Sequence, residues 1–194
     1  MTQTRNVPPP GGGGRRPTAA ITVVGLIGLT GSLMLNAALD RGEGNRLIPY
    51  LDSARIATVC RGVIRVGNKG KAIELDRRYT RDECASLNEA ETVAHLQAAM
   101  DAVPALKEGC PTNCRRLNQI VAGASLTYNI GPRAFRNSTV ARRWNAGDWH
   151  GGCDAFAMWT RAGGRHIRGL ALRRAWEQRD YCFVGLPPRA GRRP

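Results

Sequence analysis

The sequence predicts an α+β fold that is mostly α-helical, with one small early β-hairpin sheet and an N-terminal membrane helix. Three observations predict it: residues 18–39 carry no charge, apolar and polar residues alternate between residues 46 and 68, and helical periodicity follows. A chain of 194 residues has room for one sizeable domain. We expect a disordered tail at 1–17, the membrane helix at 18–39, the folded domain at 40–186 and a basic tail at 187–194.

The uncharged segment is long enough to span a membrane. As a helix, residues 18–39 would reach about 33 Å, and the apolar core of a bilayer is about 30 Å thick. The preceding tail is rich in proline and glycine and contains Arg5, Arg15 and Arg16 but no acidic residue. We therefore expect this tail to stay in the cytoplasm and the chain after Asp40 to be exported.

Three interpretations of this segment compete. A cleaved signal peptide needs small residues at its cleavage site, and Asn36-Ala37-Ala38 matches that pattern poorly. A permanent anchor is usually more apolar. A weak anchor that later leaves the bilayer fits best, because small and polar residues lower the cost of exposure to water. These residues are Thr22, Gly25, Gly28, Thr30, Gly31, Ser32 and Asn36.

The hairpin and the helices follow in order along the chain. Turn-like residues at Asp52-Ser53 and Gly67-Asn68 divide the alternating region, which predicts a small β-hairpin. Thr80 and Glu83 then form a capping box that opens a helix to about Val103. On this helix we expect a core face of Leu87, Ala90, Ala94 and Ala98.

A second helix is predicted from Thr112 to Gly131-Pro132. Its expected core residues are Leu117, Ile120, Val121, Ala124 and Leu126. Shorter helices are predicted near residues 138–145, 148–160 and 167–182.

Charge and cysteine content limit the class of partner and the compartment. A formal net charge of +14 implies a polyanionic partner, which is nucleic acid, anionic lipid or the bacterial wall. Six cysteines are dispersed along the chain without a C-x-x-C pair, which suits an oxidising compartment and argues against a zinc ribbon.

Two early carboxylates are candidates for catalysis. Glu43 follows the membrane segment, Asp52 lies nine positions later in the hairpin region, and Thr58 lies six positions after Asp52. Cleavage of a glycosidic bond uses one carboxylic acid to protonate the leaving oxygen and a second carboxylate for the attacking water or the developing cation. Spacing alone is weak evidence for catalysis, because two acidic residues nine positions apart are also typical of charges on a solvated surface.

The neighbouring residues make this pattern more specific. Glu43-Gly44, Tyr50-x-Asp52 and Thr58-Val59-Cys60-x-Gly62 resemble the active-site stretch of phage-type lysozymes, glycoside hydrolase family 24. The Glu–x8–Asp–x5–Thr spacing of that family's catalytic triad is kept here. Later segments, from Tyr128 to Gly131 and from Phe135 to Thr139 among others, resemble its cleft and C-terminal helices. The resemblance covers about Gly42 to Val184 and implies a lysozyme-like fold. With the weak anchor, the chain resembles a signal-anchor-release endolysin.

The resemblance implies muramidase activity on peptidoglycan, with inversion and without a cofactor or metal. Glu43 would be the general acid, Asp52 the carboxylate that positions or activates water, and Thr58 a hydrogen-bond partner of that water. The domain would lie in the periplasm, anchored in the inner membrane through residues 18–39 and then released. We also expect a monomer that causes host lysis. The implied substrate-binding residues are Tyr128, Asn129, Phe135 and Ser138.

The chain departs from the family at one place. Gly62-Val63, preceded by Arg61, stands where the family commonly has Gly-His, which puts the edge of the cleft in doubt. The resemblance also implies that some of Cys60, Cys84, Cys153 and Cys182 are paired. Cys110 and Cys114 would either close a local loop or remain free thiols.

Two other functions remain open at this stage. A wall-binding or nucleic-acid-binding protein would use the arginine pairs along the chain, although export argues against a nucleic-acid partner. A lytic transglycosylase keeps the acid but needs no partner to position water, so Asp52 and Thr58 argue against it.

Overall fold

The computed structural model describes residues 21–52, 55–66 and 71–189. Its longer helices are α1 (Val23–Glu43), α2 (Arg81–Ala102), α3 (Leu117–Ile130) and α7 (Arg168–Glu177). Between α3 and α7 lie α4 (Pro132–Arg136), α5 (Thr139–Asn145) and α6 (Trp149–Asp154). Short helical turns are η1 (Pro104–Lys107), η2 (Ala155–Met158) and η3 (Gln178–Cys182). The strands are β1 (Arg46–Leu51), β2 (Ala57–Cys60), β3 (Arg65–Val66), β4 (Lys71–Ala72), β5 (Arg161–Ala162) and β6 (Arg165–His166).

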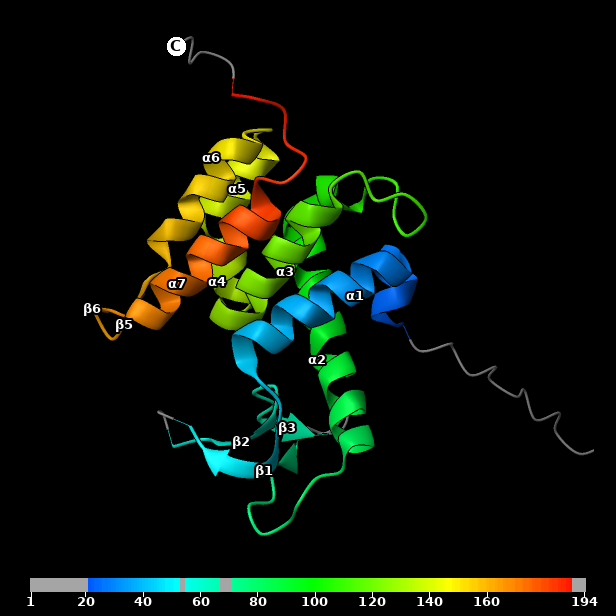
Figure 1. Ribbon diagram of the computed structural model, residues 1–194, viewed down its shortest axis with the longest axis vertical. Coiled ribbons are helices and arrows are strands. Elements are labelled where there is room, and N and C mark those ends of the chain that lie inside the picture. Colours follow the sequence, from blue (N-terminus) through cyan, green and yellow to red (C-terminus); the bar gives the residue numbers. More distant parts are fainter. Residues whose placement is uncertain (1–20, 53–54, 67–70, 190–194) are drawn as a thin grey trace, which may run out of the picture.

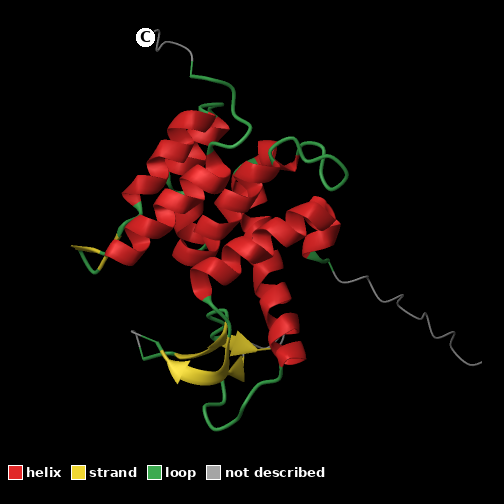
Figure 2. Cartoon of the chain, viewed as in Figure 1, coloured by secondary structure: helices red, strands yellow, loops and turns green. Residues whose placement is uncertain are grey.

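The molecule has a small sheet lobe and a larger helical lobe. Strands β1 to β4 lie at one end, most helices lie at the other, and α2 runs from the first lobe into the second (Figures 1 and 2). Strands β1 and β2 pair antiparallel, with Tyr50 opposite Thr58. The predicted α+β class, with its early hairpin, is confirmed.

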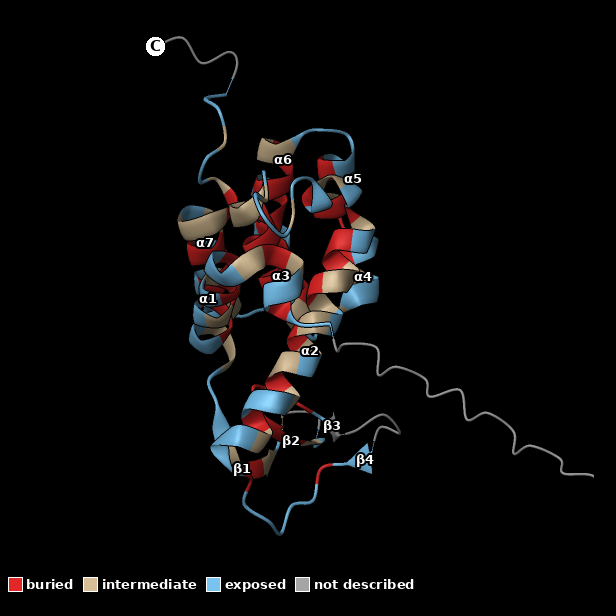
Figure 3. Ribbon diagram, turned by 90° about the vertical axis from the view of Figure 1, so that its right-hand side faces the viewer, coloured by how far each residue is buried: buried red, intermediate tan, exposed pale blue. Residues whose placement is uncertain are grey.

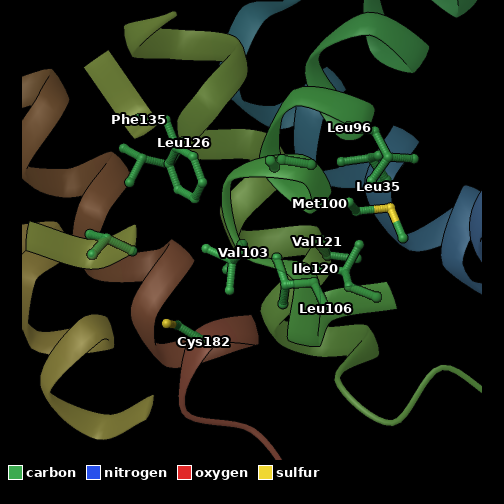
Figure 4. Close-up of a cluster of buried hydrophobic side chains, with 14 of the residues drawn as sticks. Leu35, Leu96, Met100, Val103, Leu106, Ile120, Val121, Leu126, Phe135 and Cys182 are labelled. Carbon is green, nitrogen blue, oxygen red and sulfur yellow. The ribbon is translucent and has the colours of Figure 1, made fainter. Parts of the chain in front are cut away.

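The core of the helical lobe is built around α3. This helix is buried along most of its length between α1 and α4 (Figure 3). Aliphatic side chains of α1, α2, η1 and α3 converge there, and each is less than 5% exposed (Figure 4). They are Leu35, Leu96, Met100, Leu106, Ile120, Val121 and Leu126.

The predicted membrane segment contributes a full helix to this core. Val23, Ile27, Leu35 and Leu39 are at most 2% exposed, and the helix bends at Gly28, where φ is +72°. Within the part of the chain that the structure describes, α1 alone is long and apolar enough to cross a membrane, a test that core helices of soluble proteins also pass. The helix extends to Glu43, four residues beyond the predicted end at 39.

Parts of the predicted domain division lie outside the described residues. These parts are the disordered tail at 1–17, the first three positions of the membrane segment and residues 190–194 of the basic tail.

The core face predicted for α2 is wrong. Ala90 and Ala94 are exposed, and the buried face instead carries Cys84, Asn88, Thr92, Leu96, Ala99 and Met100. Asn88 and Thr92 on this face are polar because they form hydrogen bonds with buried backbone groups. Asn88 Oδ1 accepts a hydrogen bond from the Arg61 backbone N–H, and the Thr92 hydroxyl donates to the Asn88 carbonyl. An apolar periodicity count cannot find such a face. The capping box at Thr80 and Glu83 is present as predicted.

The second helix begins at Leu117, five residues later than predicted. Residues 110–116 form turns closed by a disulfide between Cys110 and Cys114. Of the predicted core positions, Ile120, Val121, Ala124 and Leu126 are buried, whereas Leu117 is half-buried.

All six cysteines are paired. Cys60–Cys84 joins β2 to α2, Cys153–Cys182 joins α6 to η3, and Cys110–Cys114 closes the loop before α3.

We expect exported protein to show no free thiol under denaturing conditions; six free thiols would contradict this pairing. Replacing Cys60 and Cys84 by alanine should lower the free energy of unfolding by about 3.5 kcal/mol, the loop-closure value for a 24-residue separation. Urea unfolding would measure the loss.

Candidate active site

Glu43 is the last residue of α1. The helix ends there because Gly44 adopts φ +70°, a conformation that favours glycine. The Glu43 side chain is 20% exposed, and Arg173 Nη1 of α7 donates to its Oε1 at 2.6 Å. Gly42 permits this approach, since a Cβ atom at that position would lie 2.7 Å from the Arg173 guanidinium carbon.

The hairpin brings Asp52 and Thr58 together at its turn. Asp52 follows β1, and its Oδ1 accepts a hydrogen bond from the Ile56 backbone N–H at 2.9 Å. Thr58, in β2, donates its hydroxyl to the Ile56 carbonyl, also at 2.9 Å. Both side chains are thus held by hydrogen bonds to the backbone of one turn residue, Ile56. Thr58 is only 3% exposed.

Tyr128 and Gly62 lie where this hairpin meets Glu43. A Cβ atom on Gly62 would lie 3.9 Å from Glu43 Oε2. The Tyr128 hydroxyl donates to the Arg61 carbonyl at 2.9 Å. Burial raises the pKa of the Tyr128 hydroxyl, and the negative charge of Glu43 adds to the rise. The hydroxyl therefore stays neutral throughout the ordinary pH range.

The departure from the family pattern has a structural consequence at Arg61 and Val63. Val63 is buried in the small core of the sheet lobe, where it pairs with Val59 through two backbone hydrogen bonds of 2.9 Å. Arg61, only 8% exposed, points back to α1: its Nε donates to Asp40 at 2.7 Å and its Nη1 to Asn36 at 2.8 Å. Arg61 therefore joins the hairpin to the helix that carries Glu43. Sequence reasoning noted Arg61 only as a departure.

Replacing Arg61 by methionine should lower the free energy of unfolding by about 2 kcal/mol, the scale of hydrogen bonds to a charged group. Methionine keeps much of the apolar stem but leaves Asn36 and Asp40 without their shared donor. Arg115→Met is the matched control, because the Arg115 side chain is 75% exposed and its ion pair is long. Urea unfolding of both variants measures the difference, and equal losses would contradict the bridging role of Arg61.

The four predicted substrate-binding residues fall into two groups. Tyr128 lies beside Glu43, and Asn129 lines a pocket of about 400 Å³ together with Glu43, Arg173 and Trp176. Phe135 is instead fully buried against Trp144, with ring centroids 6.3 Å apart. Ser138 is 4% exposed and caps α5 by accepting a hydrogen bond from the Ala141 N–H. Phe135 and Ser138 thus serve packing and capping in the structure, and their contact with substrate stays a prediction.

Two residues of α7 that the sequence analysis did not assign to the site also belong to it. Arg173 contacts Glu43 directly, and Glu177 contacts Arg173. The i,i+4 spacing of Arg173 and Glu177 was the available signal. Among the described residues, no group of three or more His, Cys, Asp or Glu side chains would hold a metal ion.

A larger helical lobe joined by a long helix to a small hairpin lobe is the architecture of a lysozyme. The model of the phage lysozyme family matches residues 40–177, and this chain belongs to that family.

Within the family, the chain is similar to SAR-endolysins. That of Enterobacteria phage P21 is 36% identical over 172 residues, covering 88% of this chain and 96% of the relative. That of Enterobacteria phage PA-2 is 34% identical with the same coverage.

Solved structures agree with this assignment. The endolysin from Escherichia coli O157:H7 phage FAHEc1 superposes with a TM-score of 0.64 at 29% identity, covering 80% of this chain and 94% of the other. A variant of P22 lysozyme gives a TM-score of 0.59 at 32% identity, with coverage of 77% and 95%.

Proposed function

We propose that this protein is an endolysin that hydrolyses the β-1,4 bond between N-acetylmuramic acid and N-acetylglucosamine in peptidoglycan, and so lyses the host cell. The observation that carries the proposal is the placement of Glu43 at the end of α1, beside a hairpin that holds Asp52 and Thr58 through Ile56. Membership of the phage lysozyme family supports it.

In the proposed reaction, Glu43 gives its proton to the glycosidic oxygen as the bond from that oxygen to C1 breaks. The oxygen of a water molecule forms the new bond to C1 from the opposite face of the sugar, and a proton of that water passes to the Asp52 carboxylate. The Thr58 hydroxyl already donates to the Ile56 carbonyl, so its oxygen remains available as an acceptor for the same water. The product has inverted stereochemistry, and the reaction requires no metal or cofactor.

Membrane anchoring and the folded site exclude each other in this proposal. Val23, Ile27, Leu35 and Leu39 cannot fill the core of the helical lobe while they lie in the bilayer. The anchored enzyme is therefore inactive, and release into the periplasm as a monomer completes the site. Peptidoglycan is the polyanionic partner that the net charge of +14 serves, and nucleic acid is not.

Analysis of sugar ends in digested peptidoglycan tests the reaction. Hydrolysis creates new reducing ends, whereas a lytic transglycosylase leaves anhydro ends. A wall-binding protein without catalysis releases nothing. Predominantly anhydro products would overturn the proposed hydrolysis while leaving the endolysin role intact.

A further inference from the structure

A buried cluster of charges lies directly behind Glu43. Glu177 is fully buried, and its Oε1 accepts hydrogen bonds from Ser125 Oγ at 2.7 Å, Arg173 Nε at 3.0 Å and Arg174 Nη2 at 3.1 Å. Its Oε2 lies 2.8 Å from Arg174 Nε. Arg173 and Arg174 are 6% and 1% exposed. Burying a carboxylate costs several kcal/mol before its partners compensate, and buried ion pairs are often replaceable by apolar residues without loss of stability.

The same cluster bears on the proposed reaction. The guanidinium of Arg173, 2.6 Å from Glu43, favours the ionised form of that carboxyl, whereas a general acid must carry a proton. The second carboxylate on Arg173, that of Glu177, offsets part of this positive charge. Burial raises the pKa of the Glu177 carboxyl while both arginines oppose the rise, and burial lowers the pKa of Arg174 to about 10.

We propose that Glu177 is a positioning residue for catalysis: together with the Ser125 carbonyl oxygen it holds the Arg173 guanidinium against the Glu43 carboxyl, and it takes a share of the positive charge of Arg173. This inference rests on the proposed role of Glu43 as general acid. It assigns a catalytic purpose to a carboxylate that lies behind the site and does not face the substrate.

Other groups around Glu43 complete the electrostatic setting. The Tyr128 hydroxyl on α3 is neutral, because burial raises its pKa. Arg61 follows β2 and is paired with Asp40, and Arg41 on α1 is paired with Asp180. Glu91 on α2 acts on Tyr128 at longer range. Arg173 is therefore the charged group in direct contact with Glu43, and Glu177 is its second anionic partner.

The test measures the pH at which the rate falls on the alkaline side of the pH–rate profile. This alkaline limb marks the loss of the proton from the general acid. Glu177→Gln leaves the charge of Arg173 to Glu43 alone, so we expect this limb to move to lower pH by about one unit, the effect of one nearby charge. Arg174→Met removes the competing cation from Glu177, so the limb should move to higher pH. Glu177→Asp retains the charge and should keep the limb near its wild-type position.

Two further variants separate this effect from stability and from net charge. Glu177→Gln leaves two buried arginines with too little negative charge, which weakens the fold. The double variant Glu177→Gln/Arg174→Met restores the balance, and because it removes one charge of each sign its limb should lie between those of the two single variants. Asp101→Asn, at an exposed pair with Lys107, changes net charge equally and should leave the limb in place. An unchanged limb in folded Glu177→Gln would overturn the proposal and make Glu177 a purely structural residue.

A readout independent of catalysis distinguishes the two proposals. The carboxyl carbon resonance of Glu43, followed by NMR in the full chain, should change at lower pH in Glu177→Gln than in the wild type. If Glu43→Gln retained activity, the proposed catalytic role would fail, and this titration would still test the sharing of charge.

Discussion

Replacing Glu43 by glutamine should reduce peptidoglycan hydrolysis at least about a hundredfold, because an amide cannot supply the proton that the leaving oxygen needs. The fold should survive, since a glutamine oxygen still accepts a hydrogen bond from Arg173 and Arg173 keeps its second partner, Glu177. Turbidity loss of purified cell walls measures the rate, and thermal unfolding checks the fold. Asp52→Asn should be severely impaired in the same assay.

The matched control is Glu74→Gln, which changes an exposed carboxylate of the sheet lobe. It carries the same loss of charge and should leave the rate near the wild-type value. If Glu43→Gln cleared walls as fast as this control, the assignment of the general acid would be wrong.

Local sequence signals predicted the helices and the hairpin of the fold. The buried face of a helix could not always be predicted, because it depends on contacts with distant residues. The capping box at Thr80 and four of the five predicted core positions of α3 follow from short-range rules, and these predictions are confirmed. The buried face of α2 does not, because Asn88 is buried to satisfy the backbone of Arg61 across 27 residues of sequence. Periodicity in one helix contains no information about such a partner.

The candidate site was likewise predictable from the sequence only in part. A resemblance in spacing singled out Glu43, Asp52 and Thr58 as candidates, and the structure brings the latter two together at Ile56. Arg173 reaches Glu43 across 130 residues, a contact that no local pattern predicts. Phe135 lies next to cleft-like motifs in sequence, yet its side chain turns into the core. Proximity in sequence gave no information about the direction of that side chain.

The first helix is ambiguous in sequence for a physical reason. An apolar segment that crosses a bilayer and one that fills a protein core have similar composition, and α1 meets both descriptions. Its glycines are the distinguishing feature in the folded state. A Cβ atom at Gly31 would lie 2.7 Å from Leu117 Cδ1, and one at Gly28 would lie 2.8 Å from the Pro111 carbonyl oxygen. These glycines let α1 approach the loop before α3 and α3 itself.

Leucine substitutions on α1 should therefore separate release from refolding. Gly25, Thr30 and Ala37 are exposed in the folded domain, so leucine there leaves the core unchanged. Each leucine favours the bilayer by about 0.3–0.6 kcal/mol on insertion scales, so the triple variant should be held by a further 1–2 kcal/mol, roughly a tenfold shift in the partition. Residues 18–39 contain no cysteine, so the proposed release does not use a thiol of this segment, and we expect collapse of the membrane potential to trigger it. After depolarisation, the triple variant should remain in the membrane fraction and lyse poorly.

A second variant and a control complete this experiment. Gly31→Leu should be released into the soluble fraction yet show little activity, because its side chain collides with Leu117 and prevents α1 from presenting Glu43. Gly25→Ala/Thr30→Ser/Ala37→Ser alters the same exposed positions without added apolar bulk and should be released at least as fast as the wild type. Soluble, fully lytic protein from the leucine triple would mean that the segment is cleaved or plays no part in retention. Full activity of Gly31→Leu would mean that the packing of α1 on α3 is not needed to place Glu43 opposite the hairpin.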